Sequence, residues 1–111
     1  MWEKTRHGAI DIVCGDKPLI TDNIGSLRRI LEECVQDGQP RLVLDFRQVS
    51  LIDSAGIELL LDVRDACARR AGCIQLAALN PLCMDILRVT GAANHFEIYG
   101  DSVAAAGSFS Q

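Results

Sequence analysis

One hydroxyl group in the sequence stands where a modification would change the surface of the protein. Ser54 lies in the tetrapeptide Asp53-Ser54-Ala55-Gly56, directly after an apolar stretch and directly before a segment with helical spacing. A serine at such a strand-to-helix turn is exposed, and the first N–H groups of a helix lack partners within it. Phosphorylation of Ser54 would therefore add charge at the rim of a compact domain. The residues alone also allow a purely structural explanation, because Asp or Ser caps a helix and small residues let backbone segments pack closely.

Catalysis would need further groups that the sequence does not place near this serine. The chain has no glycine-rich phosphate-binding loop, and Ser54 lies in Ile-Asp-Ser-Ala-Gly, not in the Gly-x-Ser-x-Gly elbow of hydrolases. His7 and His95 stand at opposite ends of the chain without the spacing of metal ligands. Four carboxylates could form an acidic cluster, but such groups on a helix rim are usually solvated: Asp45, Asp53, Glu58 and Asp62. We expect no enzyme activity, no cofactor and no metal site.

The composition is that of an ordinary globular domain. Of the 111 residues, 49% are apolar and only 5% are aromatic, which predicts an aliphatic core. The formal net charge of −4 and the lack of a basic run argue against direct nucleic-acid binding. No apolar run approaches the ~18 residues of a membrane span and no signal segment opens the chain, so we expect a cytoplasmic protein. Five cysteines without a Cys-x-x-Cys pair indicate free, mostly buried thiols: Cys14, Cys34, Cys67, Cys73 and Cys83.

The first third of the chain predicts a strand, a turn and a helix. Residues 8–14 form the strand, residues 15–18 the turn, and residues 19–20 a brief returning strand. Thr21, Asp22 and Asn23 are all good N-cap residues, which places the start of a helix here. Its buried face is predicted to contain Ile24, Leu27, Leu31, Cys34 and Val35, and residues 37–40 end it.

Strands and helices continue to alternate through the rest of the chain. Residues 41–46 are too apolar for an exposed strand, which predicts a central place in the sheet. The helix that begins at Ser54 is predicted to bury Ile57, Leu60, Leu61, Ala68 and Ala71, and to end at Gly72. Residues 73–79 form the next strand.

The C-terminal third contains the best-marked helix start. Asn80 caps a helix, and Pro81 suits its first position because no N–H is needed there. The predicted buried stripe is Leu82, Cys83, Ile86, Leu87 and Val89, and Thr90-Gly91 closes the helix. A strand at residues 95–99 and a short helix at residues 101–106 follow, and residues 107–111 are expected to fray.

These elements predict an α/β fold. We expect one mixed, largely parallel sheet of four to five strands, with about four helices packed on it and an antiparallel first pair. The chain is expected to form a single domain over residues 1–111, with its core at about residues 8–106. Trp2 is expected at a flexible or strand-edge terminus, with the anchoring of a partner as the alternative.

Two motifs resemble those of STAS domains, the family of the anti-sigma-factor antagonists. The first is DFRQVSLIDSAGI, from Asp45 to Ile57, and the second is Asn80-Pro81 followed by Leu87 and Thr90-Gly91. The order and length of the predicted elements agree with that family over about residues 8–106. The resemblance therefore implies a STAS-like fold.

The resemblance also implies a function in partner switching. In that family, the serine after the motif aspartate, here Ser54, is phosphorylated by an anti-sigma factor with serine-kinase activity. The unphosphorylated form binds that kinase, and so frees a sigma factor, whereas the phosphorylated form releases it until a PP2C-type phosphatase restores it. The resemblance implies a partner-binding surface of Asp53, Ser54, Ala55, Gly56, Glu58 and Asp22, on a monomer or weak dimer.

The sequence departs from the family pattern in three places. Glu58 stands where the family commonly has a small residue, four positions after Ser54. Residues 15–20 replace the usual Gly-Glu-Leu-Asp element, and Asp22 is the candidate for its acidic residue. Ala55 removes a second hydroxyl, so Ser54 is the only phosphate acceptor in the tetrapeptide Asp53-Ser54-Ala55-Gly56.

Two other functions remain open for a domain of this family. One is a STAS subunit without phosphorylation, such as a partner of a lipid-transport ABC complex or a scaffold in a stress-sensing assembly. The face around Ser54, Glu58 and Asp62 would then be a constant docking surface. The other is a nucleotide-binding STAS module, for which the sequence has no phosphate loop.

Overall fold

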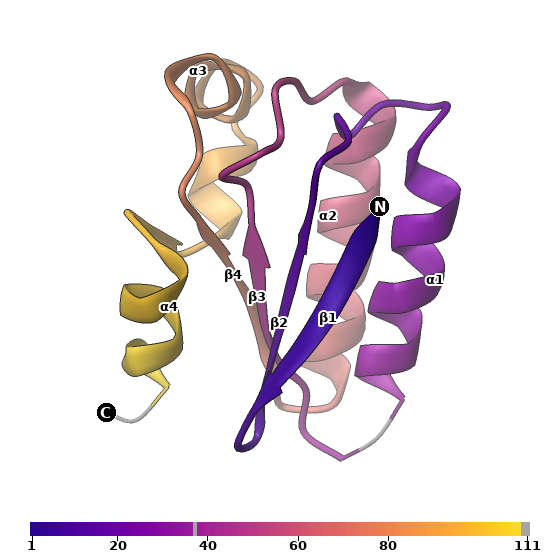
Figure 1. The fold of residues 1–111 in the computed structure, drawn as a ribbon, viewed down its shortest axis with the longest axis vertical. Coiled ribbons are helices and arrows are strands. Elements are labelled where there is room, and N and C mark those ends of the chain that lie inside the picture. The colour runs from indigo at the N-terminus through magenta and orange to yellow at the C-terminus, as the bar shows by residue number, and fades with distance from the viewer. Residues whose placement is uncertain (37, 110–111) are drawn as a thin grey trace.

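A computed structural model describes residues 1–36 and 38–109. It contains a single five-stranded sheet with the strand order β1-β2-β3-β4-β5 (Figure 1). The strands are β1 Trp2–His7, β2 Ile10–Gly15, β3 Arg41–Asp45, β4 Cys73–Ala77 and β5 Ile98–Tyr99. The β1–β2 pair is antiparallel, and β2 to β5 run parallel. The predicted mixed, largely parallel α/β sheet is confirmed.

Within residues 1–36 and 38–109, four α-helices and one 3-10 helix accompany the sheet. They are α1 Ile24–Val35, α2 Ser54–Arg69, α3 Pro81–Val89, η1 Ala92–His95 and α4 Ser102–Ser108. Helices α1 and α2 lie side by side against one face of the sheet, whereas α4 lies on the opposite face (Figure 1). Since α1 and α2 both follow parallel strands, their N-termini lie at the same end of the molecule, where the strands end.

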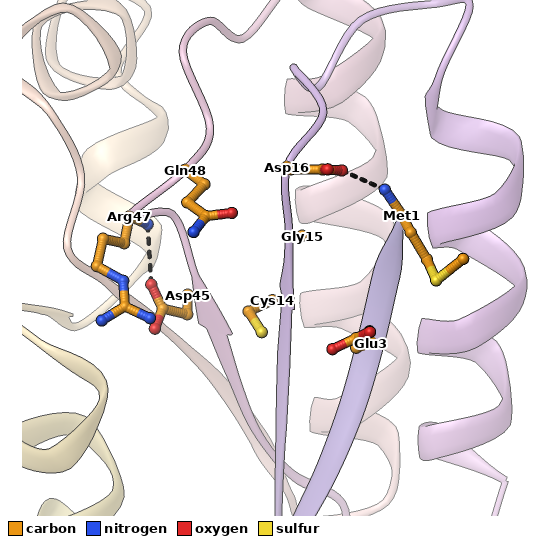
Figure 2. Close-up of a pocket in the computed structure, with 8 residues that line it drawn as sticks. All are labelled: Met1, Glu3, Cys14, Gly15, Asp16, Asp45, Arg47 and Gln48. Carbon is orange, nitrogen blue, oxygen red and sulfur yellow. Dashed lines mark hydrogen bonds and ion pairs between the residues drawn. The ribbon is translucent and has the colours of Figure 1, made fainter.

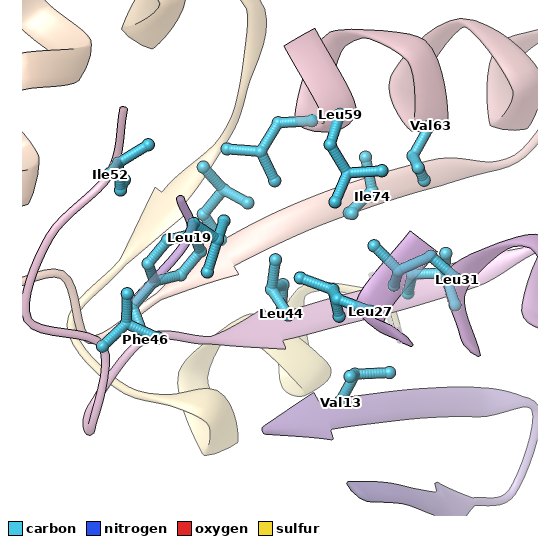
Figure 3. Packing of buried hydrophobic residues seen from close by; sticks show 14 of the residues in the cluster. Val13, Leu19, Leu27, Leu31, Leu44, Phe46, Ile52, Leu59, Val63 and Ile74 are labelled. Carbon is cyan, nitrogen blue, oxygen red and sulfur yellow. The ribbon is translucent and has the colours of Figure 1, made fainter. Parts of the chain in front are cut away.

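The main core fills the layer between the sheet and α1 with α2. Leu27 and Leu31 of α1 and Leu59 and Val63 of α2 pack against inward-facing residues of the strands, such as Leu44 (Figure 3). The side chains are almost all aliphatic, as the composition predicts. A smaller cluster, in which Ala105 of α4 packs against Val43 and Ala77 of the strands, lies between α4 and the sheet.

Strand β1 was not predicted, and the antiparallel pair is therefore a different one from that expected. Within β1, Trp2 is buried and the other five residues are exposed. This edge strand therefore lacks the alternation of apolar and polar side chains that predicts a strand from sequence. Gly8, with φ +63°, forms the turn to β2. Residues 19–20 do not form a returning strand, because Leu19 makes only an isolated parallel bridge to Ile52. Trp2 lies at a strand edge with 6% of its surface exposed, which makes it a core residue and not a partner anchor.

The buried faces of two helices also differ from the predicted ones. In α2 the buried residues are Gly56, Leu59, Leu60, Val63 and Cys67. Ala68 is exposed within α2, and Ala71 is exposed because it lies after the end of α2 at Arg69, in a turn where it adopts φ +58°. In α3, Leu82 and Val89 are 52% and 87% exposed, and the buried residues are Cys83 and Leu87.

The remaining boundaries shift by a few residues. β3 and β4 end slightly earlier than predicted, and part of the last predicted strand forms η1. Helix α4 extends to Ser108, and Phe109 packs beside it. Asp37, within the predicted stop of α1, and residues 110–111 of the predicted frayed tail lie outside the described residues.

Candidate functional site

The loop from β3 to α2 ends in a hydrogen-bonded helix cap. Asp53 is the N-cap residue of α2 in an extended conformation, with φ −106° and ψ −174°. Its Oδ1 accepts a hydrogen bond of 3.0 Å from the backbone N–H of Gly56. Ser54 is therefore the first residue of α2, and its side chain is exposed. The expectation of an accessible hydroxyl at a helix N-terminus agrees with this geometry.

The same aspartate also ties α2 to the loop before α1. Its Oδ2 accepts a hydrogen bond of 3.1 Å from the backbone N–H of Thr21 and one of 3.2 Å from the Thr21 hydroxyl. The hydrogen bond from Gly56 is the main reason that the pKa of Asp53 lies below its usual range. The bonds from Thr21 act in the same direction, whereas desolvation of the carboxylate opposes them. Asp53 is thus held in its ionised form next to Ser54.

A close contact between the backbone of α2 and the loop around Leu19 stabilises this arrangement. The Leu19 N–H donates to Leu51 O at 2.9 Å, and the Asp53 N–H donates to Leu19 O at 3.0 Å. A Cβ on Gly56 would lie 2.4 Å from Leu19 O and 3.0 Å from Ile52 Cγ2. Only glycine fits at position 56, because any side chain would separate α2 from this loop.

The six predicted partner-binding residues therefore occupy different environments. Ser54, Glu58 and Asp22 are exposed, and Ala55 is half-buried. Gly56 is buried, and the carboxylate of Asp53 is occupied by Gly56 and Thr21. The structure thus gives Asp53 and Gly56 a role in positioning Ser54. The side chains of Ser54, Glu58, Asp22 and Ala55 are accessible at the surface.

The acidic residues do not converge on one point. Asp62 forms an ion pair with Arg28 of α1, with 3.5 Å between Oδ2 and the guanidinium. Because Leu44 faces α1 and α2, its neighbour Asp45 points to the opposite face of the sheet. Within residues 1–36 and 38–109, no three His, Cys, Asp or Glu side chains are grouped closely enough to hold a metal ion.

Neither of the two histidines lies beside Ser54. His7 ends β1, at the edge of the sheet opposite the N-terminus of α2. The backbone oxygen of His95 accepts a hydrogen bond from Arg64, ten residues or about 15 Å along α2 from Ser54. The described residues therefore form no Ser–His pair of the kind that hydrolases use at Ser54.

Sequence reasoning missed the contributions of Thr21 and Leu19. Thr21 was considered as a cap for α1, but Asn23 is the N-cap residue and makes no side-chain capping bond. The sequence offers no local signal for the bond between Thr21 and Asp53, because the two residues are 32 positions apart.

Comparison with known proteins identifies the family of the chain. The sequence profile of the STAS domain family matches residues 1–105 of the chain. The chain belongs to the STAS domain family. No sequence among the curated proteins matches it.

Solved structures of other proteins share the fold at low sequence identity. An anti-sigma factor antagonist from Mycobacterium paratuberculosis is 19% identical, with a TM-score of 0.89 over 100% of this chain and 94% of that one. The Bacillus protein SpoIIAA, in its phosphorylated form, is 14% identical, with a TM-score of 0.73 over 97% of this chain and 99% of that one. The mouse anion transporter Slc26a9 is 19% identical, with a TM-score of 0.78 over 92% of this chain but only 18% of the transporter. At these identities, the similarity shows the fold alone.

Proposed function

We propose that this STAS domain is an anti-sigma-factor antagonist whose binding to an anti-sigma serine kinase is controlled by phosphorylation of Ser54. The observation that carries the proposal is the exposed Ser54 side chain at the start of α2, in a loop fixed by Asp53. A PP2C-type phosphatase would reverse the modification. The similarity to antagonists that comprise little more than one such domain supports an independent regulatory protein, without enzyme activity, in the cytoplasm.

The electrostatics around Ser54 support a switch that needs no refolding. A phosphate at the N-terminus of α2 is tolerated by the free domain, because the helix dipole and unpaired N–H groups favour an anion. Within an interface, the added charge of about −1.5 to −2 would meet the carboxylates of Glu58 and Asp22. Arg28, a cation of the neighbouring helix, is already paired with Asp62. The phosphorylated face would repel an acidic or nucleotide-bearing partner surface that the unphosphorylated face accepts.

The proposal is tested with purified protein, ATP and each serine-kinase anti-sigma factor encoded in the same genome. We expect one of these kinases to add a single phosphate, located at Ser54 by peptide mass spectrometry. Ser54→Ala should abolish the modification, whereas Ser50→Ala, which alters an exposed serine of the same loop, should not.

Binding measurements complete this test. Ser54→Asp should weaken the complex at least about tenfold, which corresponds to 1.4 kcal/mol. Ser54→Ala should bind irrespective of ATP. A kinase that binds the protein but leaves Ser54 unmodified would contradict the proposed switch.

A second candidate function is a constant docking subunit of a membrane transport assembly. It is favoured by the similarity to a domain that makes up 18% of the Slc26a9 transporter. None of the described helices is long and apolar enough to cross a membrane, so the membrane part would belong to another protein or segment. Co-purification with a transporter or ATPase subunit, unchanged by phosphatase treatment, would favour this function over the first.

A further inference from the structure

Two pockets beside the sheet differ in how their buried acidic groups are satisfied. The larger one, of about 230 Å³, lies where β2 and β3 end (Figure 2). There the Asp45 carboxylate accepts a hydrogen bond of 2.8 Å from the Arg47 N–H, and Asp16 pairs with the amino group of Met1. The smaller one, of about 80 Å³, lies near the opposite end of the strands, between the start of β2 and the last turn of α1. The buried acidic group of this smaller pocket is Asp11.

Asp11 is a buried carboxylate that lacks a hydrogen bond. Its side chain is 8% exposed, and among the described residues no donor forms a hydrogen bond to its Oδ1. Arg6, the register partner of Asp11 in β1, comes within 3.6 Å of that oxygen, which is an ion pair but too long for a hydrogen bond. The same guanidinium is also engaged elsewhere, since its Nε donates to Gly8 O at 3.0 Å. Because a buried carboxylate without a hydrogen bond is costly, Oδ1 is a free acceptor for a donor that enters the pocket.

Charges of both signs meet in this small pocket. Lys4, Arg6, Asp11 and Glu33 all line it. Their convergence is evident at the buried thiol of Cys34, whose pKa is raised to about 11, first by burial and then by Asp11. Lys4 and Arg6 lower this pKa, and Glu33 raises it. In the described part of the chain, Lys4 and Glu33 form no ion pair, so a cation and a second anion are available beside Asp11.

These charges and the volume restrict the ligands that the pocket can hold. A simple cation would be repelled by Lys4 and Arg6, and a simple anion would be repelled by Asp11 and Glu33. A molecule that carries an ammonium group and a carboxylate a few bonds apart can place each charge beside its opposite. The volume equals the share of about two to three water molecules in the liquid, which limits the enclosed part of the ligand to a few non-hydrogen atoms.

We propose that this pocket binds a small α-amino acid such as glycine, with its ammonium group on Asp11 and its carboxylate on Lys4. The ammonium group would give Oδ1 the charge-assisted hydrogen bond that it lacks, and Glu33 would add to the attraction. The carboxylate would pair with the Lys4 ammonium group, whose flexible stem lets it turn toward the ligand. The pocket lies at the opposite end of the parallel strands from Ser54, so the proposal does not depend on phosphorylation.

The test is an NMR titration of the purified chain with glycine at low salt, up to ~50 mM because so small a ligand has little surface to bind through. Chemical shift changes are expected at residues 4–6, at Asp11 and at residues 33–34. Methylamine lacks the carboxylate of glycine, and acetate lacks its ammonium group. At matched ionic strength, each should bind at least about fivefold more weakly than glycine, as expected for the loss of one partly exposed ion pair.

Three variants separate a ligand site from a purely structural ion pair. Asp11→Asn keeps the shape of the side chain and should weaken glycine binding about fivefold or more. Its urea midpoint should be unchanged or higher, because the variant removes a buried charge and leaves Arg6, which is 63% exposed, in contact with water. Lys4→Gln should weaken glycine binding to a similar extent. Lys17→Gln, which alters an exposed lysine outside the pocket, should bind glycine like the wild type.

The proposal fails if glycine causes no shift changes in the pocket, which would mean that the pocket holds water alone. It also fails if methylamine or acetate binds as tightly as glycine, or if Lys17→Gln weakens binding as much as Lys4→Gln. A lower urea midpoint for Asp11→Asn with unchanged glycine binding would assign the carboxylate to the fold alone and overturn the proposed site. None of these outcomes depends on whether Ser54 is phosphorylated.

Discussion

Replacing Gly56 with alanine should disrupt the contact that positions the phosphorylation loop. Gly56 lies in the first turn of α2, and its α-carbon packs directly on the backbone of Leu19. An alanine Cβ would lie 2.4 Å from Leu19 O and 2.9 Å from Leu19 Cβ. That oxygen cannot retreat freely, because it accepts the hydrogen bond from the Asp53 N–H.

The size of the effect follows from two opposing contributions. Alanine is favoured over glycine inside a helix by up to about 1 kcal/mol. Overpacking in a closely packed interior costs about 1–3 kcal/mol, and a clash with a fixed backbone oxygen belongs at the upper end of that range. We therefore expect Gly56→Ala to lower the free energy of unfolding by about 2 kcal/mol. The corresponding decrease in Tm is about 8 °C for a domain of this size.

Urea denaturation followed by circular dichroism measures this change, with a lower midpoint and an unchanged m-value expected. Gly25→Ala is the matched control, since Gly25 is also near the start of a helix but its Cβ would meet no atom within 4 Å. That variant should be as stable as the wild type, or more stable by up to about 1 kcal/mol. If Gly56→Ala and Gly25→Ala behaved alike, the close approach of α2 to the Leu19 loop would be refuted.

Two further predictions concern titratable groups. Because the folded-state pKa of Asp53 is lowered, its ionised carboxylate stabilises the fold at pH values above the unfolded-state pKa of about 3.9. This stabilisation is lost as the pH falls from there through the folded-state pKa. Asp53→Asn should therefore be less stable than the wild type at neutral pH and should lose less stability in acid. Urea midpoints from pH 2 to pH 7 measure this difference. If the variant and the wild type had the same acid profile, this role of Asp53 would be ruled out. Burial raises the pKa of Cys67 to about 12 and that of Cys34 to about 11, so iodoacetamide at pH 8 should modify the exposed Cys73 first and should reach Cys67 only after unfolding. Peptide mass spectrometry measures the order, and early modification of Cys67 would be inconsistent with its buried position.

The fold was largely predictable because its central elements have unambiguous local patterns. The apolar run of β3 predicted a central strand, and Asn80 followed by Pro81 predicted the start of α3, where Asn80 Oδ1 does accept the Cys83 N–H at 2.7 Å. The edge strand β1 was not predictable in the same way, because five of its six residues are exposed and carry no apolar periodicity.

The position of Ser54 could be predicted from the sequence, but the hydrogen bonds and contacts that hold it could not. The sequence by itself determined that Ser54 opens a helix, since Asp53 and the small residues after it favour that start. The predicted strand directly before Ser54 is instead a loop of residues 46–53 between β3 and α2. Only the tertiary structure decided which atoms hold the turn, because Thr21 and Leu19 reach Asp53 and Gly56 through the arrangement of two loops that are more than 30 residues apart. The partners of a strand residue across a sheet depend on strand order and register, and these follow from the packing of the whole domain.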